Sequence, residues 1–505
     1  MISNERIAAK RQELHQIVDQ LLRHVSEGVE QQTPIHEVES QTFQTLLEAG
    51  RTTLQWLIDL QGDGDVGEEH QMLDGKTLQR SPEPHPRPYV SIFGELRIER
   101  YVYAQREGQK IEFAAVDARL ALPESKFSYL LQDWDQDFAM EQPFGKVKRT
   151  VEKILGLDQH VDSLERMNRQ MAQHVEDFHA AQSAPPAKEE GQIFVQTADG
   201  KGVPIRRPAD TPPIHDHQHQ RGPKPDRKKM ATIGAVYSVD PFVRTPEEVV
   251  AALFHDPRKE EGSKRKRPRP CHKRMRGMLN HVDEEGNEID GRPAIFGWIS
   301  EEMASRRVDD SRPAVCIMDG ELSLWSMRDV FQPDASLVDI VDLLHVTPRL
   351  WDAAALFHPR ESRAAEKFVR ERALRILQGD VQGVIRGLRR MGTQRLSGKK
   401  RADLKKICNY FENNRQRMRY DEYLAAGYPI ASGVIEGACR HIVKDRMERT
   451  GMNWVVAGAQ AMLDLRCIYL CDAWDEYVDY RIEKETERLY PYRDSLQPVS
   501  WSLAA

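Results

Sequence analysis

Three acidic residues that lie far apart in the chain occupy settings in which a carboxylate could hold a divalent metal ion. Asp199 and Asp319 each end an apolar run and precede a glycine, and Glu436 lies in a segment with helical spacing. Mg²⁺ prefers oxygen ligands and usually takes a few carboxylates together with water and substrate phosphate. Two such ions about 4 Å apart activate the attacking oxygen and stabilise the leaving oxygen of a phosphodiester. The trio therefore indicates two-metal phosphodiester chemistry, with two Mg²⁺ ions, or Mn²⁺ in their place, as the expected cofactor.

Strands are needed to bring the two aspartates together. A strand that ends in Asp-Gly delivers the carboxylate to the edge of a sheet, and the glycine lets backbone or substrate approach closely. Each residue taken singly has a simpler interpretation. Asp199 and Asp319 could be turn residues, and Glu436 could belong to a solvated helix with ion pairs. The combination of the three, with basic segments between them, favours the metal site.

The segment around Glu436 is predicted to form one helix over 433–448. Glu436, Arg440 and Lys444 are spaced i, i+4, i+8 and would share a face of that helix. A carboxylate beside cations on one face suits a site that holds metal and phosphate together. Arg446 in the same segment is a further candidate DNA contact.

Trp454 follows this basic helix, which Gly451 is expected to end. An indole released at that point could stack on a frayed or flipped base beside a cleavage site. The alternative is a core tryptophan that packs the final helix.

Asp342 and His345 form a short Asp-x-x-His motif after the apolar run 336–341. Both side chains could support the metal cluster or contact a flanking phosphate. The alternative is an aspartate that caps a helix and a histidine whose hydrogen bonds are satisfied locally.

Basic residues are concentrated in two segments of a chain whose formal net charge is −6. Ten Lys or Arg fall between Arg258 and Arg276, and twelve fall between Arg386 and Arg419. Such asymmetry favours a locally basic channel for DNA over the alternative of solvated helix faces. The candidate DNA contacts in the first segment are Lys264, Arg265, Lys266, Arg267, Arg269, Lys273 and Arg274.

Periodicity divides the chain into a helical first part and a mixed second part. Residues 1–60 show helical spacing, 89–103 alternate as a hairpin, and two helices, 144–155 and 161–175, flank a glycine turn. The pair resembles a helix-turn-helix, although helix–glycine–helix connections also occur without DNA. Strands are predicted at 192–199, 230–239, 314–318 and 336–342, another element begins at 294–299, and 351–423 reads as helical and basic. The pattern predicts an α/β core interrupted by an all-α insertion.

The resulting division has five parts. They are a helical N-terminal region (1–88), a hairpin with a helix-turn-helix-like DNA-binding region (89–180), the first part of the catalytic core (190–350), a basic helical insertion (351–425), and the glutamate helix with C-terminal helices (426–505).

Cysteine usage and hydropathy limit the class of protein. The six cysteines are scattered without a Cys-x-x-Cys pair, which argues against a zinc ribbon or a disulfide framework. No signal peptide and no run of about 18 apolar residues are present, so we expect a soluble, cytoplasmic protein without a membrane partner.

The sequence resembles bacterial insertion-sequence DDE transposases of the ISKra type over roughly 190–505. The matching stretches are 196–204, 234–241, 316–320, 342–345, 431–439, 443–447 and 450–454. Some relatives carry cysteine pairs after the N-terminal hairpin, and their absence from 101–108 puts a zinc-stabilised module there in doubt.

The resemblance implies a ribonuclease-H-like catalytic core with a helical insertion, in which Asp199, Asp319 and Glu436 bind the metal and Asp342 and His345 support them. It implies a DNA transposase that binds the terminal inverted repeats of its element, cleaves the strand and transfers it to target DNA. We expect a homodimer or higher oligomer on double-stranded DNA, associated with the nucleoid. The alternatives are a structure-specific nuclease with the same core, which would cut without joining, and a non-catalytic DNA-binding regulator.

Overall fold

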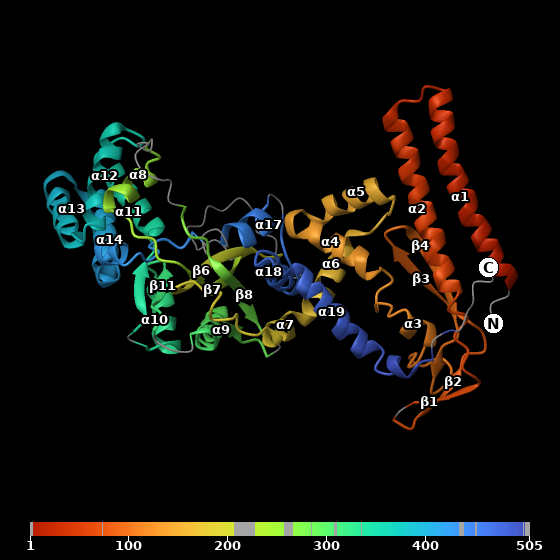
Figure 1. Cartoon of the computed structure of the whole chain (residues 1–505). Helices are drawn as coiled ribbons and strands as arrows, with labels where there is room; N and C mark the ends of the chain where they lie inside the picture. The colour runs from red at the N-terminus through yellow and green to blue at the C-terminus, as the bar shows by residue number, and fades with distance from the viewer. Residues whose placement is uncertain are drawn as a thin grey trace, which may run out of the picture. The chain divides into compact units, whose positions relative to one another are not determined.

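The computed structural model describes residues 4–72, 74–206, 228–256, 266–283, 285–307, 311–334, 336–433, 439–449, 452–497 and 499. The chain divides into two compact units (Figure 1). Unit 1 comprises Met1–Phe178 and Asp475–Ala505, and unit 2 comprises His179–Trp474. The region predicted as 426–505 is therefore shared between the two units.

Unit 2 is built on a mixed five-stranded sheet whose strand order is β12-β11-β6-β7-β8. The strands are β6 (Ile193–Pro204), β7 (Lys228–Val239), β8 (Cys271–Leu279), β11 (Ala314–Met318) and β12 (Val338–Val341). β6, β7 and β8 form an antiparallel meander, and β11 pairs parallel to both β6 and β12. All five residues of β11 are buried, as expected of a central strand that is covered on both faces.

Helices surround this sheet. They are α8 (Pro246–Leu253), α9 (Gly291–Arg306), α10 (Leu322–Phe331), α11 (Leu343–Phe357), α12 (Arg363–Leu377), α13 (Val381–Arg395), α14 (Gly398–Asn414), α15 (Tyr420–Ala425), α17 (Asp445–Met447) and α18 (Val456–Tyr469), with a 3₁₀ turn η2 (Arg415–Arg417) and a π-helical segment η3 (Cys439–Lys444). A small ribbon pairs β9 (His281–Val282) with β10 (Glu288–Ile289).

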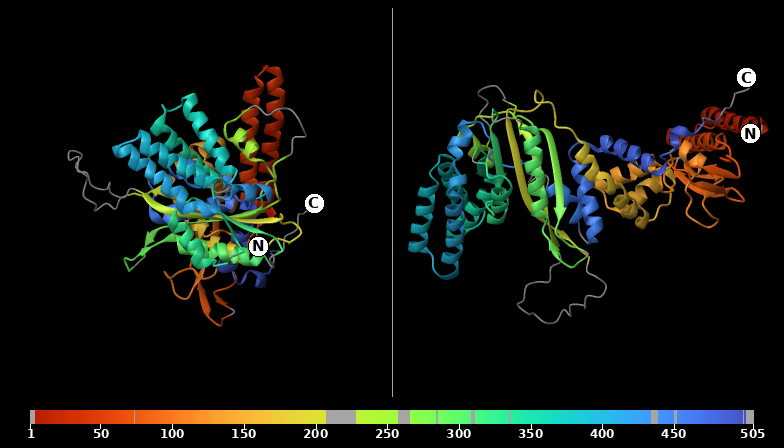
Figure 2. Two further views of the ribbon diagram at one scale, coloured as in Figure 1. Left: turned by 90° about the vertical axis from the view of Figure 1, so that its left-hand side faces the viewer. Right: turned by 90° about the horizontal axis from the view of Figure 1, so that it is seen from below.

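Helix α9 packs closely on one face of the sheet. A Cβ on Gly234 of β7 would lie 2.6 Å from Ile295 Cγ2 and 2.9 Å from Ile299 Cδ1, so a glycine is required for this approach. Figure 2 shows α9 alongside the strands. The residues of β7 with the opposite parity, including Ile233 and Tyr237, face the other side.

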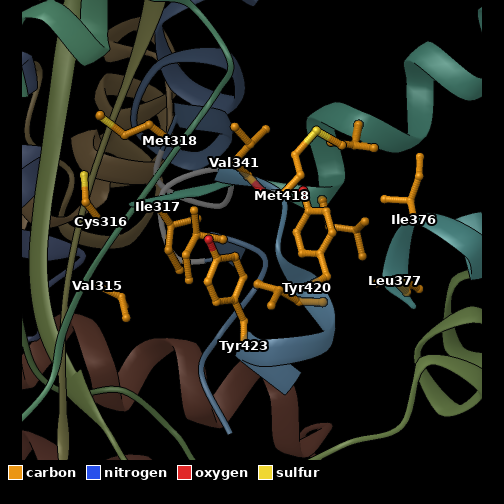
Figure 3. Packing of buried hydrophobic residues seen from close by; sticks show 14 of the residues in the cluster. Val315, Cys316, Ile317, Met318, Val341, Ile376, Leu377, Met418, Tyr420 and Tyr423 are labelled. Carbon is orange, nitrogen blue, oxygen red and sulfur yellow. Dashed lines mark hydrogen bonds between the residues drawn. The ribbon is translucent and has the colours of Figure 1, made fainter. Parts of the chain in front are cut away.

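The helices α11 to α15 share one hydrophobic core with the sheet and do not form a separate domain. Figure 3 shows Tyr420 and Tyr423 of α15 among side chains from β11, β12 and α12. Both phenols are anchored to backbone carbonyls of β12, because Tyr420 Oη donates to Val341 O at 2.7 Å and Tyr423 Oη donates to Asp339 O at 3.0 Å. The helical stretch starts at Leu343, before the predicted 351.

The sequence prediction of a mixed α/β chain is confirmed, with two local corrections. β8 was not among the predicted strands, although Met275, Gly277 and Leu279 alternate inward along it. Residues 294–299 belong to helix α9. No helix among the described residues has the length and apolarity needed to cross a membrane.

Unit 1 contains a long antiparallel helix pair, two small sheets and a helical cluster. Its elements are α1 (Asn4–Glu30), α2 (Ile35–Asp59), β1 (Glu69–Gln71), β2 (Thr77–Arg80), β3 (His85–Ser91), β4 (Gly94–Arg100), β5 (Tyr103–Ala104), α3 (Ala115–Arg119), α4 (Tyr129–Glu141), α5 (Phe144–Leu155), α6 (Val161–Met171), η1 (Ala172–His174), α7 (Val175–Ala181), α19 (Trp474–Leu489) and η4 (Arg493–Ser495), of which α7 and α19 straddle the boundaries between the units. The hairpin β3–β4 was expected, and its turn lies at 92–93.

The helix-turn-helix-like region packs as three helices, α4, α5 and α6. α5 ends where Gly156 takes a left-handed conformation, with φ 70°, which is a common way for a helix to terminate. Val147, Val151 and Leu164 are among the buried side chains of α5 and α6.

Buried polar side chains tie these helices to one another and to the C-terminal helix. Asn168 Nδ2 donates to Gln136 Oε1 at 2.8 Å, and Gln136 Nε2 donates to the Leu164 carbonyl at 3.1 Å. From α19, Arg481 donates to Gln132 Oε1 at 2.7 Å, and the Tyr477 phenol donates to the Met171 carbonyl. The helix-turn-helix-like region therefore depends on a helix more than 300 residues later in the sequence.

Asp135 makes the stability of unit 1 dependent on pH. Burial raises its pKa to about 7, with Gln159 donating to Oδ1 at 3.3 Å as a smaller opposing effect. An unfolded carboxyl titrates near about 3.9. The folded state thus binds the proton more tightly, so its extra stability is complete below about pH 4 and is lost as pH rises through about 7.

We expect Asp135→Asn to raise the free energy of unfolding of unit 1 by roughly 2–4 kcal/mol at pH 8 and to change it little at pH 4. Calorimetric unfolding of the full chain between pH 4 and pH 8 would measure this. If the free energy of unfolding depended on pH in the same way in the variant and in the original chain, Asp135 would not be the titrating group.

Candidate metal centre

Asp199 and Asp319 follow two residues that are paired in register on adjacent parallel strands. Ala198 of β6 pairs with Met318 of β11, and each aspartate is the next residue. Neighbouring strands are about 4.8 Å apart, and residues at matching register point to the same face. Two carboxylates from distant parts of the sequence are thereby brought to one point of the sheet.

Asp199 does not end its strand, contrary to the sequence prediction. β6 continues to Pro204 because β7 pairs with it throughout, with Asp199 opposite Ile233. Asp199 instead marks the level at which the parallel neighbour β11 stops. Its Oδ1 accepts a hydrogen bond of 2.7 Å from the Gly200 N–H.

Asp319 lies just after β11 and is contacted by side chains from two helices. The Tyr410 phenol of α14 donates to Oδ1 at 3.2 Å, and His345 Nδ1 of α11 lies 3.5 Å from Oδ2. The side chains of Asp319 and His345 are 24% and 32% exposed, so solvent and a phosphate can reach both. The Trp325 indole donates to the Asp319 carbonyl at 2.8 Å, which holds the backbone in place.

Gly320 allows α14 to approach this corner of the sheet. A Cβ there would lie 2.5 Å from Tyr410 Cε2 and 2.6 Å from Asn414 Nδ2. Asn414 donates to the Gly320 carbonyl at 3.3 Å. Burial, reinforced by the neighbouring Asp319, raises the pKa of the Tyr410 phenol, so it stays a hydrogen-bond donor. Sequence reasoning missed both Tyr410 and Asn414.

Asp342 is a buried anchor, and its 0% exposure removes it from direct contact with a phosphate. Its Oδ1 caps α11 by accepting from Leu344 N at 2.8 Å. Its Oδ2 accepts from the Ser432 N–H at 3.0 Å and from the Ser432 hydroxyl. Asp342 N also donates to the Met318 carbonyl at 2.9 Å. Asp342 thus connects Ser432 to the end of β11, next to Asp319, through its side chain and its backbone N–H.

Glu436 lies outside the described residues, which stop at 433 and resume at 439. The segment that follows differs from the predicted single α-helix, because Cys439–Lys444 is π-helical and α17 ends at Met447. A π-helix bonds i to i+5, so this segment is not the continuous α-helix that was predicted. The backbone of 439–444 packs beside β6.

The cations and the tryptophan of this segment have different environments. The Arg440 side chain lies outside the description, and Lys444 is exposed. Arg446 is 0% exposed and sits over the Trp454 ring, 5.1 Å from its centroid, so its proposed role as a DNA contact is wrong.

Trp454 is held on both sides by protein. Its indole N–H donates to the Met447 carbonyl at 3.1 Å, and its backbone pairs with the end of β6 through Pro204 O and Arg206 N. The half-buried ring is therefore part of the packing beside β6. This packing does not favour the prediction that a DNA base stacks on Trp454.

The first basic segment is divided by the structure. Lys264 and Arg265 lie outside the described residues, whereas Lys266, Arg267 and Arg269 are exposed before β8. Lys273 is half-buried within β8. Arg274 is 18% exposed, with its guanidinium bonded to both Glu302 carboxylate oxygens at 3.1 Å. Its candidacy as a DNA contact is therefore corrected to a structural ion pair.

Neutralising the exposed cations should weaken DNA binding for all sequences. We expect the combined change of Lys266, Arg267 and Arg269 to Gln to make the salt dependence of binding shallower by about 0.9 in log–log slope per lost phosphate contact. Exchanging the same three residues between Lys and Arg keeps the charge and is the control. An unchanged slope in the glutamine variant would remove this cluster from the DNA interface.

Two members of the predicted metal-binding trio therefore follow paired residues of adjacent strands, and the third, Glu436, lies outside the described residues. Within the part of the chain that the structure describes, no group of three His, Cys, Asp or Glu side chains is arranged to hold a metal ion. Asp199 and Asp319 supply carboxylate oxygens, which Mg²⁺ prefers as ligands, and a metal site here needs at least one further ligand.

No family model and no curated protein matches the chain. Among solved structures, the Drosophila P element transposase strand transfer complex is similar with a TM-score of 0.24 and 10% sequence identity, over 72% of this chain and 84% of that chain. At that TM-score the similarity carries no argument about fold or function.

Proposed function

We propose that this protein is a metal-dependent DNA transposase that cleaves the ends of its element and joins them to target DNA. The observation that carries the proposal is the placement of Asp199 and Asp319 in matching register at one point of the sheet. A half-buried histidine beside this pair and exposed cations before β8 provide contacts for a phosphate backbone.

The topology of unit 2 supports a ribonuclease-H-like core. Three antiparallel strands are followed by two parallel strands that add to the opposite side of the first strand, with α9 and α10 as the intervening helices. Helices α11 to α15 then occupy the place of the expected insertion before Glu436. The resemblance noted in the sequence concerns the same arrangement.

The roles of the side chains follow from their contacts. Asp199, Asp319 and Glu436 would hold two Mg²⁺ ions, which when bound polarise the scissile phosphate and lower the pKa of an attacking water. Tyr410 and His345 orient the Asp319 carboxylate. Asp342 positions the chain that leads to Glu436 through Ser432. The cations before β8 neutralise phosphates along the strand.

The test is to incubate the full chain and Mg²⁺ with a plasmid that carries the element and to map the DNA breaks. We expect breaks at the two ends of the element, and joined products when pre-cleaved ends and target DNA are supplied. Cleavage without joining would assign a nuclease activity. Binding without cleavage would leave a regulator and overturn the proposal.

A further inference from the structure

A cleft of about 470 Å³ opens on unit 2 away from the aspartate pair. This size is within the range of about 300–1,000 Å³ that is typical of small-ligand sites. Three segments form its walls: the end of β7 with the loop after it, the extended stretch before β8, and the stretch that runs from Gly427 to Gly433. Neither Asp199 nor Asp319 lines it.

The cleft lies on the face of the sheet opposite α9, at a distance from the aspartate pair along β7. Tyr237, in its wall, is four residues along β7 from Ile233, which pairs with Asp199. That separation is about 13 Å along a strand. Ala431 and Gly433, also in the wall, flank Ser432, which Asp342 fastens to the strand end near Asp319.

The cleft contains more positive than negative charge. Arg244, Arg267 and Arg269 line it, and Arg244 Nε is buried with no hydrogen-bond partner among the residues that the structure describes. Burial, together with the neighbouring Arg267, lowers the pKa of Arg244 to about 10, and the attraction of Glu248 offsets this only in part. Both nearby carboxylates accept backbone hydrogen bonds.

Asp240 accepts a hydrogen bond of 3.3 Å from Gln192 N, and Glu248 accepts from the Thr245 N–H at 2.8 Å in the cap of α8. The Arg244 Nε–H group is not hydrogen-bonded to either carboxylate. An anion entering the cleft would therefore find guanidinium N–H groups available.

The remaining walls are aromatic and apolar. Phe242 and Tyr428 are half-buried and Tyr237 is almost fully buried, and the Arg244 guanidinium lies 5.8 Å from the centre of the Phe242 ring. Aromatic and guanidinium planes together are the surfaces on which unpaired bases stack, with the guanidiniums also bonding the phosphate.

We propose that this cleft binds one unpaired nucleotide of the DNA strand, with its base against Phe242 and Tyr428 and its phosphate on Arg244 and Arg267. The proposal rests on the proposed function, because DNA brought to the aspartate pair supplies the strand. Under this proposal the unpaired base stacks in this cleft and not on Trp454. A nucleotide from solution has the same chemistry, and the experiment separates the two sources.

The test uses the full chain in EDTA, where no cleavage can occur, and duplexes with a short single-stranded end that carries 2-aminopurine at one position at a time. We expect the fluorescence to fall at one overhang position and to stay unchanged in a fully paired duplex. Phe242→Ala should weaken binding of the overhang duplex by roughly 5- to 100-fold, the loss of one stacked base. Arg244→Gln should abolish the fluorescence change, whereas the exposed Arg360→Gln, with the same change in charge, should retain it.

Competition with deoxyadenosine monophosphate identifies the source of the nucleotide. Weak competition, in the millimolar range, supports DNA as the source. Displacement at micromolar concentration, lost in Arg244→Gln, would assign the cleft to a free nucleotide and overturn the DNA part. A fluorescence change that persists in both Arg244→Gln and Phe242→Ala, with normal melting, would overturn the site itself. Cleavage in Mg²⁺, measured in parallel, reports separately on the proposed function.

Discussion

Asp199→Asn, Asp319→Asn and Glu436→Gln should each lower the rate of DNA cleavage by more than about 100-fold. Loss of a residue that only hydrogen-bonds to a metal ligand typically lowers activity by about 10- to 100-fold, and loss of the ligand itself should cost more. Binding of DNA in the absence of metal should stay within a few-fold, because the neutral side chains keep their shape. The reason is that an amide oxygen is a weaker ligand and carries no charge to balance the metal. Rates of plasmid cleavage in Mg²⁺ and affinities in EDTA would measure the two effects.

Two variants serve as controls for this result. Glu321→Gln makes the same change of charge two residues from Asp319 at an exposed position and should cleave normally. Tyr410→Phe removes a hydrogen bond to Asp319 while leaving the carboxylate, so its loss should be at most about 10- to 100-fold. Robust cleavage by any one of the three acid variants would exclude that residue from the metal-binding set.

Asp342→Ala should lower the free energy of unfolding by roughly 2–5 kcal/mol, which combines a lost helix cap of about 1–2 kcal/mol with buried donors left unsatisfied at about 1–3 kcal/mol. The donors are the Leu344 N–H and both donor groups of Ser432. We also expect cleavage to fall below what the folded fraction explains, since the chain before Glu436 loses its anchor.

Ser432→Ala separates the anchor from the cap. It removes the hydroxyl and leaves the helix cap and the Ser432 N–H bond, so its stability loss should be about 1 kcal/mol. Chemical denaturation, with cleavage rates measured well below the midpoint, would compare the two variants. Equal stability of Asp342→Ala and the original chain would contradict the buried-anchor role.

The sequence predicted those features that depend on local pattern. The strand 314–318 is wholly apolar and was placed at its observed bounds, because a buried central strand requires such a run. The helix 144–155 was placed equally well, since Gly156 provides its termination. The alternation in 89–100 was sufficient to predict the hairpin.

Features that depend on tertiary approach could not be predicted in this way. Tyr410 reaches Asp319 because Gly320 lets α14 come close, and neither residue signals the contact in the sequence. The buried Arg446 looked like its exposed neighbours, since its partner Trp454 adjoins it only in the fold. The basic content of β8 obscured its inward alternation.

The C-terminal helix α19 has a consequence for the order in which the protein can mature on the ribosome. Arg481 and Tyr477 complete the packing of α4 and α6. The helix-turn-helix-like region therefore lacks these buried contacts until α19 has been synthesised. A chain that stops before α19 would thus lack the contacts that Tyr477 and Arg481 make with Met171 and Gln132. Complete packing of α4 and α6 would therefore follow synthesis of the whole of unit 2.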